Sequence, residues 1–184
     1  MSEVLINLPQ LVMFKESLSD LKEISVPAQF SVRSYQNGDD IKWEKIIQAS
    51  FNSKMSFKKD IEANEFFRTE RVYFVCDKGE PIATAIAWYD KNWDSSVGYL
   101  HMVGMLQEYG GKGLGRQASL AALHQMKRDG RKSAVLTTDD FRIPAIKTYL
   151  KMGFKPQITH KSHQDRWIKI LECIGRTELI SEFI

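Results

Sequence analysis

The sequence contains little cysteine, and its cysteines are widely separated. Only Cys76 and Cys173 occur among the 184 residues, and no CxxC pair is present. A disulfide framework needs a set of pairing cysteines and a zinc ribbon needs CxxC pairs, so the sequence argues against both. Scarce, unpaired cysteines are typical of a reducing compartment, which makes a cytoplasmic protein the expectation.

Long apolar runs and an excess of one sign of charge are also missing. No apolar run approaches the roughly 20 residues that cross a bilayer, and we find no basic segment followed by an apolar one, as in a signal peptide. Lysines and arginines number 26 against 23 aspartates and glutamates, a net charge of +3, without a concentrated basic stripe. We therefore expect no membrane and no nucleic-acid partner. A mildly basic chain still suits an anionic ligand in a local site.

What the sequence does contain suffices for one hydrophobic core. Hydrophobic residues make up 43% and charged residues 27%, as is usual for a soluble globular protein. A typical domain has about 100–200 residues, so we expect a single domain over residues 1–184. Residues 1–28 are expected to form an N-terminal arm with a weak helical stripe. Residues 160–184 are expected to form a C-terminal extension with an amphipathic helix.

Apolar periodicity and turn residues predict alternating strands and helices. The expected strands cover residues 30–35, 71–76, 81–89, 97–106 and 134–137, with a short piece from residue 154. The expected helices cover residues 41–51, 57–67, 114–128 and 144–152. An aspartate before the first helix is expected to cap it. The order β-α-α-β-β-β-α-β-α-β is an α/β arrangement with a mixed sheet.

A glycine-rich turn joins a predicted strand to a predicted helix. Residues 110–116 read GGKGLGR. A helix start leaves about four backbone N–H groups without intrahelical acceptors, and the helix dipole adds roughly half a positive charge there. Glycines let an anion approach the backbone, and Lys112 and Arg116 add charge. The segment therefore predicts an anion site. It is neither a P-loop nor a dinucleotide fingerprint, because the required spacings are absent.

Residues 106–116 (LQEYGGKGLGR) resemble the acetyl-CoA loop of GNAT acetyltransferases, Arg/Gln-x-x-Gly-x-Gly/Ala. Gly111, Gly113 and Gly115 match that pattern. Gly110 stands where the family usually has Arg or Gln, which removes a side chain and keeps the backbone donors. The resemblance implies acetyl-CoA as cosubstrate, with its diphosphate held by the amides of the loop.

Residues 142–154 (RIPAIKTYLKMGF) resemble a second pattern of that family, Asn-x-x-Ala-x-x-x-Tyr-x-x-x-Gly-Phe. Ala145, Tyr149, Gly153 and Phe154 match, and Arg142 replaces the usual Asn. The two patterns occur in the family's order and separation. The resemblance therefore implies a GNAT-like α/β (α+β) fold: a central mixed, mostly antiparallel sheet of about six to seven strands flanked by about four helices.

The same resemblance implies roles for individual residues. Tyr149 stands where the family commonly places the general acid that protonates the leaving thiolate; packing of its ring on the sheet is the alternative. Backbone groups of Met105 and Leu106 are expected to pair with the pantetheine arm. The full set expected to hold the cosubstrate is Met105, Leu106, Gly110, Gly111, Lys112, Gly113, Leu114, Gly115, Arg116 and Arg142.

The base that takes the proton of the amine is less clear from sequence. No Glu occupies the usual strand position, which here is Val97. His101 on the same strand is a candidate, directly or through water, and a hydrogen-bonded strand histidine is the alternative. Asp139 and Asp140 are interpreted as caps of the next helix. His160 and His163 are interpreted as a solvated turn, and no metal site is expected because further ligands are lacking.

Aromatic residues allow two interpretations. Phe66, Phe67, Tyr73 and Phe74 indicate either core or a hydrophobic acceptor pocket, and the tryptophans, including Trp88, fit either. The main hypothesis is an acetyl-CoA-dependent N-acetyltransferase acting on a small-molecule or peptide amine. A non-catalytic acyl-CoA-binding or sensor module and a nucleotide-binding module remain alternatives. A homodimer through an edge strand or the C-terminal helix is left open.

Overall fold

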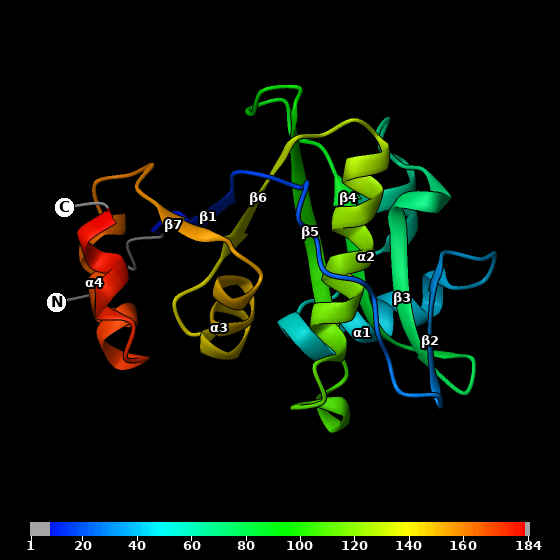
Figure 1. Ribbon diagram of the computed structural model, residues 1–184. Coiled ribbons are helices and arrows are strands. Elements are labelled where there is room, and N and C mark those ends of the chain that lie inside the picture. Colours follow the sequence, from blue (N-terminus) through cyan, green and yellow to red (C-terminus); the bar gives the residue numbers. More distant parts are fainter. Residues whose placement is uncertain (1–7, 183–184) are drawn as a thin grey trace, which may run out of the picture. The chain divides into compact units, whose positions relative to one another are not determined.

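The computed structural model describes residues 8–182 (Figure 1). The strands in this range are β1 (Leu11–Lys15), β2 (Phe30–Ser34), β3 (Val72–Asp77), β4 (Glu80–Trp88), β5 (Val97–Met105), β6 (Ser133–Thr138) and β7 (Lys155–Gln157). The α-helices are α1 (Asp40–Phe51), α2 (Leu114–Arg128), α3 (Ile143–Lys151) and α4 (His163–Cys173). The strand pairs are mostly antiparallel, so this is the predicted fold class. No described helix is long and apolar enough to cross a membrane.

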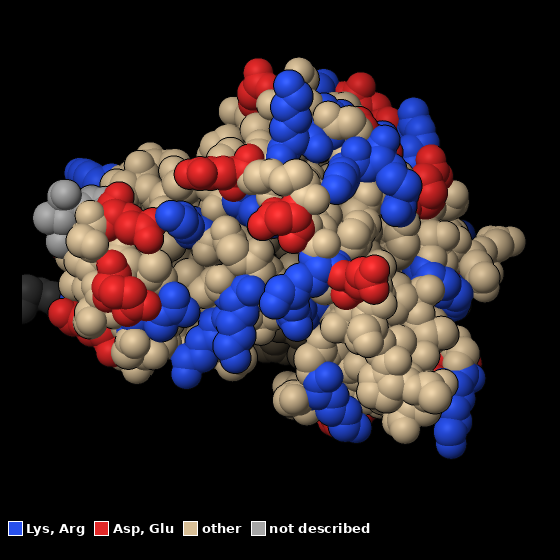
Figure 2. Space-filling model, in the orientation of Figure 1, with Lys and Arg blue, Asp and Glu red and all other residues tan. Residues whose placement is uncertain are grey.

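The chain divides into two compact units, which are described separately. The larger unit comprises residues 16–134, and the smaller unit comprises the chain up to Lys15 together with the chain from Val135 onward. Strand β6 passes from the first unit into the second. Over the face drawn in Figure 2, lysines and arginines are interspersed with aspartates and glutamates, as the nearly balanced composition indicates.

The larger unit is built on an antiparallel meander in the order β2-β3-β4-β5. Every position of β4 after Glu80 is buried, which is typical of a strand covered on both faces. Helices α1 and α2 lie on opposite faces of the meander (Figure 1). Met126 of α2 approaches Gly98, whereas Ile46 of α1 approaches Gly104. Both glycines lie on β5, where a side chain would leave too little room for these helices.

A β-bulge explains how two even-numbered positions of β5 face different helices. The pairs Thr84–Gly104 and Ile86–His101 leave two residues of β5 opposite one residue of β4. Met102, one of those two, has φ +48°, the left-handed region. One extra residue reverses the alternation of side chains between the faces. Before the bulge, odd-numbered residues such as His101 point away from α2.

The smaller unit contains β1 and β7 as an antiparallel pair, with Val12 opposite Gln157. Its strand order is β6-β1-β7. Helix α3 has Pro144 in its first turn, where the missing N–H costs nothing. Helix α4 buries Trp167 and Leu171, which agrees with the amphipathic helix expected near the C-terminus.

Two segments differ from the predicted secondary structure. In the part of the N-terminal arm that the structure describes, Leu11–Lys15 form strand β1 rather than a helix, because four of these five residues are buried and β7 pairs with them. Residues 1–7 of the expected arm lie outside the described residues. Spacing over so short a segment does not separate a strand from a helix. The helix expected over residues 57–67 is reduced to one π-helical turn, Phe57–Glu62.

The expected cap of α1 is also wrong. Asp39 is the N-cap residue by position, but its side chain makes no capping hydrogen bond. Its carboxylate instead accepts two hydrogen bonds from Arg33 (2.6 and 3.0 Å) and one from the backbone N–H of Gln36 (2.7 Å). The half-buried Arg33 competes for the carboxylate more strongly than the helix end does, because charge-assisted bidentate pairs are the stronger bonds.

Candidate functional site

The glycine-rich turn connects β5 to α2 within the larger unit. It begins with the helical turn Gln107–Tyr109 and passes through Gly111 (φ +77°) and Gly113 (φ +73°) before α2 begins. The left-handed region costs an L-residue about 1–2 kcal/mol, so glycine suits both positions. A Cβ placed on either glycine would meet no described atom within 4 Å. The backbone of the turn is therefore open to a ligand.

The start of α2 carries positive charge that the described residues do not neutralise. Gly113 has no side chain to cap the helix, and the first turn contains no acidic residue. The first N–H groups therefore lack acceptors within the helix. In the same turn, Arg116 has its Nε buried without a hydrogen-bond partner in the described range. Lys112 lies close by, with its Nζ 5.2 Å from the ring centre of Tyr109. Together these donors make up the candidate anion site that the sequence predicts.

Directly after β5 lies Leu106, which is expected to pair with the pantetheine arm. Leu106 donates its N–H to the carbonyl of Ile82 (2.9 Å), and its carbonyl accepts from the N–H of Tyr109 (3.1 Å). Both backbone groups of Leu106 therefore have partners inside the chain, and its pairing with a pantetheine arm stays a prediction. The register of β4 and β5 directs alternate residues of a strand toward each neighbour, and the N–H of Leu106 faces β4.

Met105 differs from Leu106, because its N–H points away from β4. That N–H donates to the Oγ of Ser50 on α1 (2.8 Å), and the same Oγ lies 3.1 Å from the carbonyl oxygen of Met105. Ser50 Oγ also donates to the carbonyl of Ile46 (2.8 Å). One hydroxyl therefore occupies the backbone position that the resemblance assigns to the pantetheine arm. Sequence reasoning missed Ser50, which no motif singles out.

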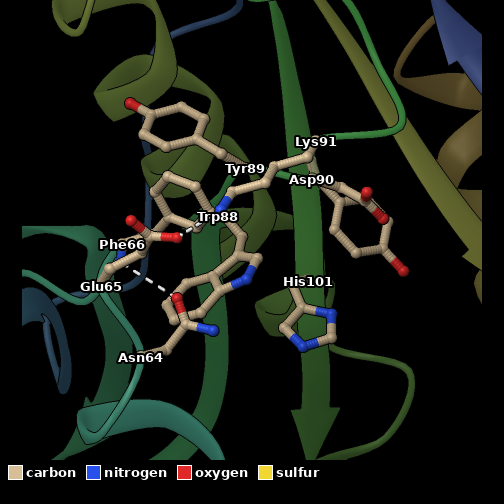
Figure 3. A pocket seen from close by; sticks show the side chains of 9 residues that line it. Asn64, Glu65, Phe66, Trp88, Tyr89, Asp90, Lys91 and His101 are labelled. Carbon is tan, nitrogen blue, oxygen red and sulfur yellow. Dashed lines mark hydrogen bonds and ion pairs between the residues drawn. The ribbon is translucent and has the colours of Figure 1, made fainter.

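A hollow of about 430 Å³ opens beside β5 in the larger unit (Figure 3). Its lining consists of Asn64, Glu65, Phe66, Trp88, Tyr89, Asp90, Lys91, Tyr99 and His101. The rings of Trp88 and His101 are stacked, with their centres 5.9 Å apart. The centre of the Tyr99 ring lies 5.1 Å from the centre of the His101 ring. Phe66 and Trp88 therefore line this hollow, whereas Phe74 is buried in the core. That the hollow is an acceptor pocket stays a prediction.

The imidazole of His101 is neutral at pH 7. Desolvation lowers its pKa to about 4, and the charge of Asp90 opposes that effect only in part. The contacts of the ring in the described range are with Trp88 and Tyr99 rather than with a hydrogen-bonding neighbour. A neutral imidazole can accept a proton from an amine, although a pKa of about 4 makes it a weak base.

Asp129, the residue after α2, holds one wall of the hollow. Its carboxylate accepts hydrogen bonds from the hydroxyl of Tyr89 (2.6 Å), Nε of Arg71 (2.9 Å) and Nε2 of Gln125 (2.8 Å). The guanidinium carbons of Arg71 and Arg131 lie 4.5 and 3.7 Å from the ring centre of Tyr89. Burial alone would raise the pKa of Asp129, but these hydrogen bonds and the charge of Arg71 lower that pKa. From sequence, Asp129 indicates only a helix end.

Tyr149 and Arg142 lie in the smaller unit. Tyr149 is on α3, and its buried ring packs edge-to-face on Phe154 with centres 6.0 Å apart. Both residues belong to the second resemblance pattern. Arg142 precedes α3, and its Nε donates to a carboxylate oxygen of Asp139 at 2.8 Å. Its guanidinium also lies 5.3 Å from the ring centre of Phe141.

The two aspartates after β6 do not cap α3 as expected. The N-cap residue is Arg142, and no side chain caps the helix in the described range. Asp139 instead accepts from Nε2 of Gln10 (3.0 Å) and from Arg142. Asp140 accepts from Nε of Arg166 on α4 (2.9 Å), a bond that lowers the pKa of Asp140. Each of the two carboxylates is therefore hydrogen-bonded to an arginine instead of to the start of α3.

The two neighbouring histidines also differ from expectation in part. His163 is buried at the start of α4 rather than solvated. The rings of His160 and His163 lie 5.8 Å apart. Within residues 8–182, no group of three histidines, cysteines or acidic residues is arranged to hold a metal ion.

Strand β5, the glycine-rich turn and the uncapped start of α2 form a strand–turn–helix arrangement whose open N–H groups suit an anion. Residues 39–154 match the Acetyltransferase (GNAT) family. This match covers more than half of the chain, so the chain belongs to the GNAT acetyltransferase family. The resemblance seen in the sequence is thereby confirmed.

Relatives and solved structures agree with this assignment. The chain is 28% identical to mycothiol acetyltransferase from Nocardia farcinica over 147 residues, which cover 74% of this chain and 48% of that relative. It thus spans about half the length of the curated relatives it matches. Among solved structures, the ribosomal-protein-S18-alanine N-acetyltransferase from Escherichia coli has a TM-score of 0.55 at 20% identity, covering 67% of this chain and 76% of that one. The NatC complex bound to Gag peptide and CoA has a TM-score of 0.58 at 19% identity, covering 67% and 83%. At these identities the structures show a shared fold.

Proposed function

We propose that the chain is an acetyl-CoA-dependent N-acetyltransferase that transfers acetyl from the thioester to a primary amine. The observation that carries the proposal is the start of α2. Two positive-φ glycines expose first-turn N–H groups there, and Arg116 brings an unpartnered buried Nε in the described range. Such an arrangement suits the diphosphate of coenzyme A. The GNAT membership of residues 39–154 supports the same cosubstrate.

The proposed reaction is direct attack. A neutral amine forms a C–N bond to the thioester carbonyl, the C–S bond breaks, and the thiolate takes a proton to leave as coenzyme A. The amine loses one proton, which we assign to the neutral His101, directly or through water. The N–H of Met105 is proposed to meet the cosubstrate after Ser50 releases it. Tyr149 is proposed as the donor of the proton to the thiolate, since a phenol holds its proton at neutral pH.

For the acceptor, the cellular location and the oligomeric state, only the class is proposed. The proposed acceptor is a small-molecule amine or an amine of a peptide, since similar proteins are named mycothiol acetyltransferase and ribosomal-protein-S18-alanine N-acetyltransferase. The cytoplasmic location and the homodimer remain predictions. Light scattering of the purified chain at several concentrations tests the homodimer.

Calorimetric titration tests the proposed function directly. We expect acetyl-CoA and CoA to bind and to raise the melting temperature, whereas ATP and NAD do not compete. Release of the CoA thiol in the presence of primary amines then tests catalysis. The absence of heat and of a thermal shift with acetyl-CoA contradicts the proposal. Binding without thiol release by any amine indicates the binding-module alternative.

Tyr149→Phe tests the proposed acid. Removing the hydroxyl is expected to lower kcat roughly 100-fold, while acetyl-CoA affinity changes little because the ring still packs on Phe154. Tyr35→Phe is the matched control, since the Tyr35 ring is stacked on Phe57 with centres 5.0 Å apart in the larger unit. Unchanged turnover in Tyr149→Phe would remove the assignment and leave Tyr149 as a packing residue.

A further inference from the structure

The hollow beside β5 combines ring faces with carboxylates, and this combination narrows the class of acceptor. Three segments of the larger unit supply it: residues 64–66, residues 88–91 and residues 99–101. Its volume of about 430 Å³ lies within the range of small-molecule pockets, about 300–1,000 Å³. The inference rests on the proposed function and concerns which amine that function takes.

The side chains that line the hollow favour a ligand with an apolar group, preferably an aromatic ring. Five of the nine lining residues carry rings: Phe66, Trp88, Tyr89, Tyr99 and His101. Figure 3 shows the indole of Trp88 beside the imidazole of His101, with Phe66 and Tyr89 higher in the same view. Ring faces bind flat apolar groups, and they also attract an ammonium group.

The charged groups of the lining favour a single cation. Lys91 pairs with Glu65 (2.6 Å), so these two charges compensate each other. Asp90 remains, with one carboxylate oxygen accepting the backbone N–H of Asn92 (2.9 Å). The imidazole of His101 adds no charge at neutral pH. Among the nine lining residues, Asp90 is therefore the charged residue that no other lining residue compensates, and its carboxylate attracts an ammonium group and repels a carboxylate. Arg71, Arg131 and Asp129 lie at the ring and hydroxyl of Tyr89.

The ring walls are held in place before any ligand arrives. The hydroxyl of Tyr89 is fixed by Asp129, and Arg71 donates to the carbonyl of Phe66 (2.9 Å). The rings of Phe66 and Tyr89 are in edge-to-face contact with centres 5.8 Å apart. A wall fixed in this way selects among ligands by shape, because little ordering remains to be done on binding.

We propose that the hollow takes arylalkylamines as acceptors: primary amines on a short chain attached to an aromatic ring, without a carboxylate beside the amine. The ring lies among the aromatic walls, and the amine end lies beside Asp90 and His101. The bound ammonium first releases one proton to water, and the neutral amine then forms the C–N bond as the C–S bond breaks. The amine's second proton passes to His101 and the thiolate takes a proton from Tyr149, so the bound cation becomes a neutral amide. The product loses its attraction to Asp90, which favours its release. A polyamine needs several carboxylates, and the lining offers one that is not paired with Lys91.

Matched pairs of amines test the proposal by release of the CoA thiol. Phenethylamine and tryptamine are compared with phenylalanine and tryptophan, which carry the same rings and add a carboxylate. We expect kcat/KM to be at least about tenfold higher for the two amines without carboxylate. Spermidine, with several charges and no ring, is expected to be a poorer acceptor than phenethylamine.

Asp90→Asn separates charge from shape. We expect kcat/KM for phenethylamine to fall about tenfold. We expect kcat/KM for phenylalanine to remain unchanged or to rise, so that the preference for phenethylamine over phenylalanine becomes smaller. Asp165→Asn is the matched control, since Asp165 is exposed on α4 and does not line the hollow. It is expected to leave the ratio unchanged. Melting temperatures of both variants confirm that they fold.

A binding measurement keeps this inference distinguishable from the proposed function. With CoA present, calorimetry compares phenethylamine with phenylacetate, which keeps the ring and reverses the charge; only phenethylamine is expected to bind. Acetyl-CoA binding together with equal use of phenylalanine and phenethylamine, or with a preference for spermidine, overturns the inference and leaves the function standing. Loss of acetyl-CoA binding itself overturns the function instead.

Discussion

The glycine-rich turn and the hollow beside β5 lie in the same unit, but they are made of different parts of the chain. The turn offers backbone N–H groups from one continuous segment, residues 110–116, with Arg116 as a supporting side chain. The hollow is made of side chains from three separate segments. Backbone donors suit a ligand group that many proteins share, whereas a set of side chains suits one particular ligand.

This difference implies that substitutions in the two regions change different measured quantities. A change in the turn should alter the affinity for acetyl-CoA and leave the choice of amine intact. A change in the hollow, or in the residues that hold it, should alter the use of the amine and leave acetyl-CoA binding intact. If one substitution alters both to the same extent, the separation of the two regions is wrong.

Gly113→Ala is expected to have the largest effect. The added methyl group stands where a diphosphate has to approach, and the positive φ strains an alanine. With a donor displaced, the affinity for acetyl-CoA should fall by about 2 kcal/mol, roughly 30-fold. Calorimetry measures this change, and the ratio of kcat/KM between two amines should stay constant.

Gly130→Ala is a closely matched control for that substitution. Gly130 also has a positive φ (+81°) and also has no described atom within 4 Å of a built Cβ, but it lies after the C-terminal end of α2. Both variants should lose about 1–2 kcal/mol of stability, and only Gly113→Ala should lose affinity for acetyl-CoA. Equal losses of affinity would mean that backbone strain, rather than contact with the diphosphate, is being measured.

Much of the fold can be predicted from the sequence where a signal is local. Residues 114–128 are predicted as a helix, and α2 spans Leu114–Arg128, because a glycine precedes its apolar stripe and Asp129-Gly130 follows it. Strand β1 could not be predicted, because five residues become a strand only by pairing with β7, more than a hundred residues away. The prediction that Asp39 caps α1 was wrong for a related reason, because Arg33 on β2 binds its carboxylate.

The same contrast divides the candidate site. The turn and Tyr149 were visible as motifs within short segments. Ser50, Asp129 and Arg71 were not, because each acts through a partner distant in sequence. His101 could be selected as a candidate from its strand, but its neutral state follows from the rings that surround it, which only the fold brings together.

Asp129→Asn tests the hollow through the residue that holds its wall. The substitution keeps the shape and removes the charge that receives Tyr89 and Arg71. The ring of Tyr89 should lose its fixed position, so we expect the KM for phenethylamine to rise roughly tenfold while the KM for acetyl-CoA stays within about twofold. Asp165→Asn again serves as the control. A rise in both KM values, or in neither, would contradict a positioning role for Asp129.

The smallest predicted effect is a pH dependence of stability that originates in the hollow. His101 has a pKa of about 4 in the folded chain and about 6.5 when unfolded. Between these values the unfolded chain binds a proton at His101 and the folded chain does not, so stability is lost as pH falls from about 6.5 toward 4. Water in the hollow reduces the effect, and we expect about 1 kcal/mol. Urea unfolding of the wild type and of His101→Asn between pH 4 and 7 measures it as the pH-dependent part of their difference in unfolding free energy. If this difference in unfolding free energy does not change with pH, the imidazole is not desolvated by its ring neighbours. The environment inferred for His101 in the hollow would then be wrong.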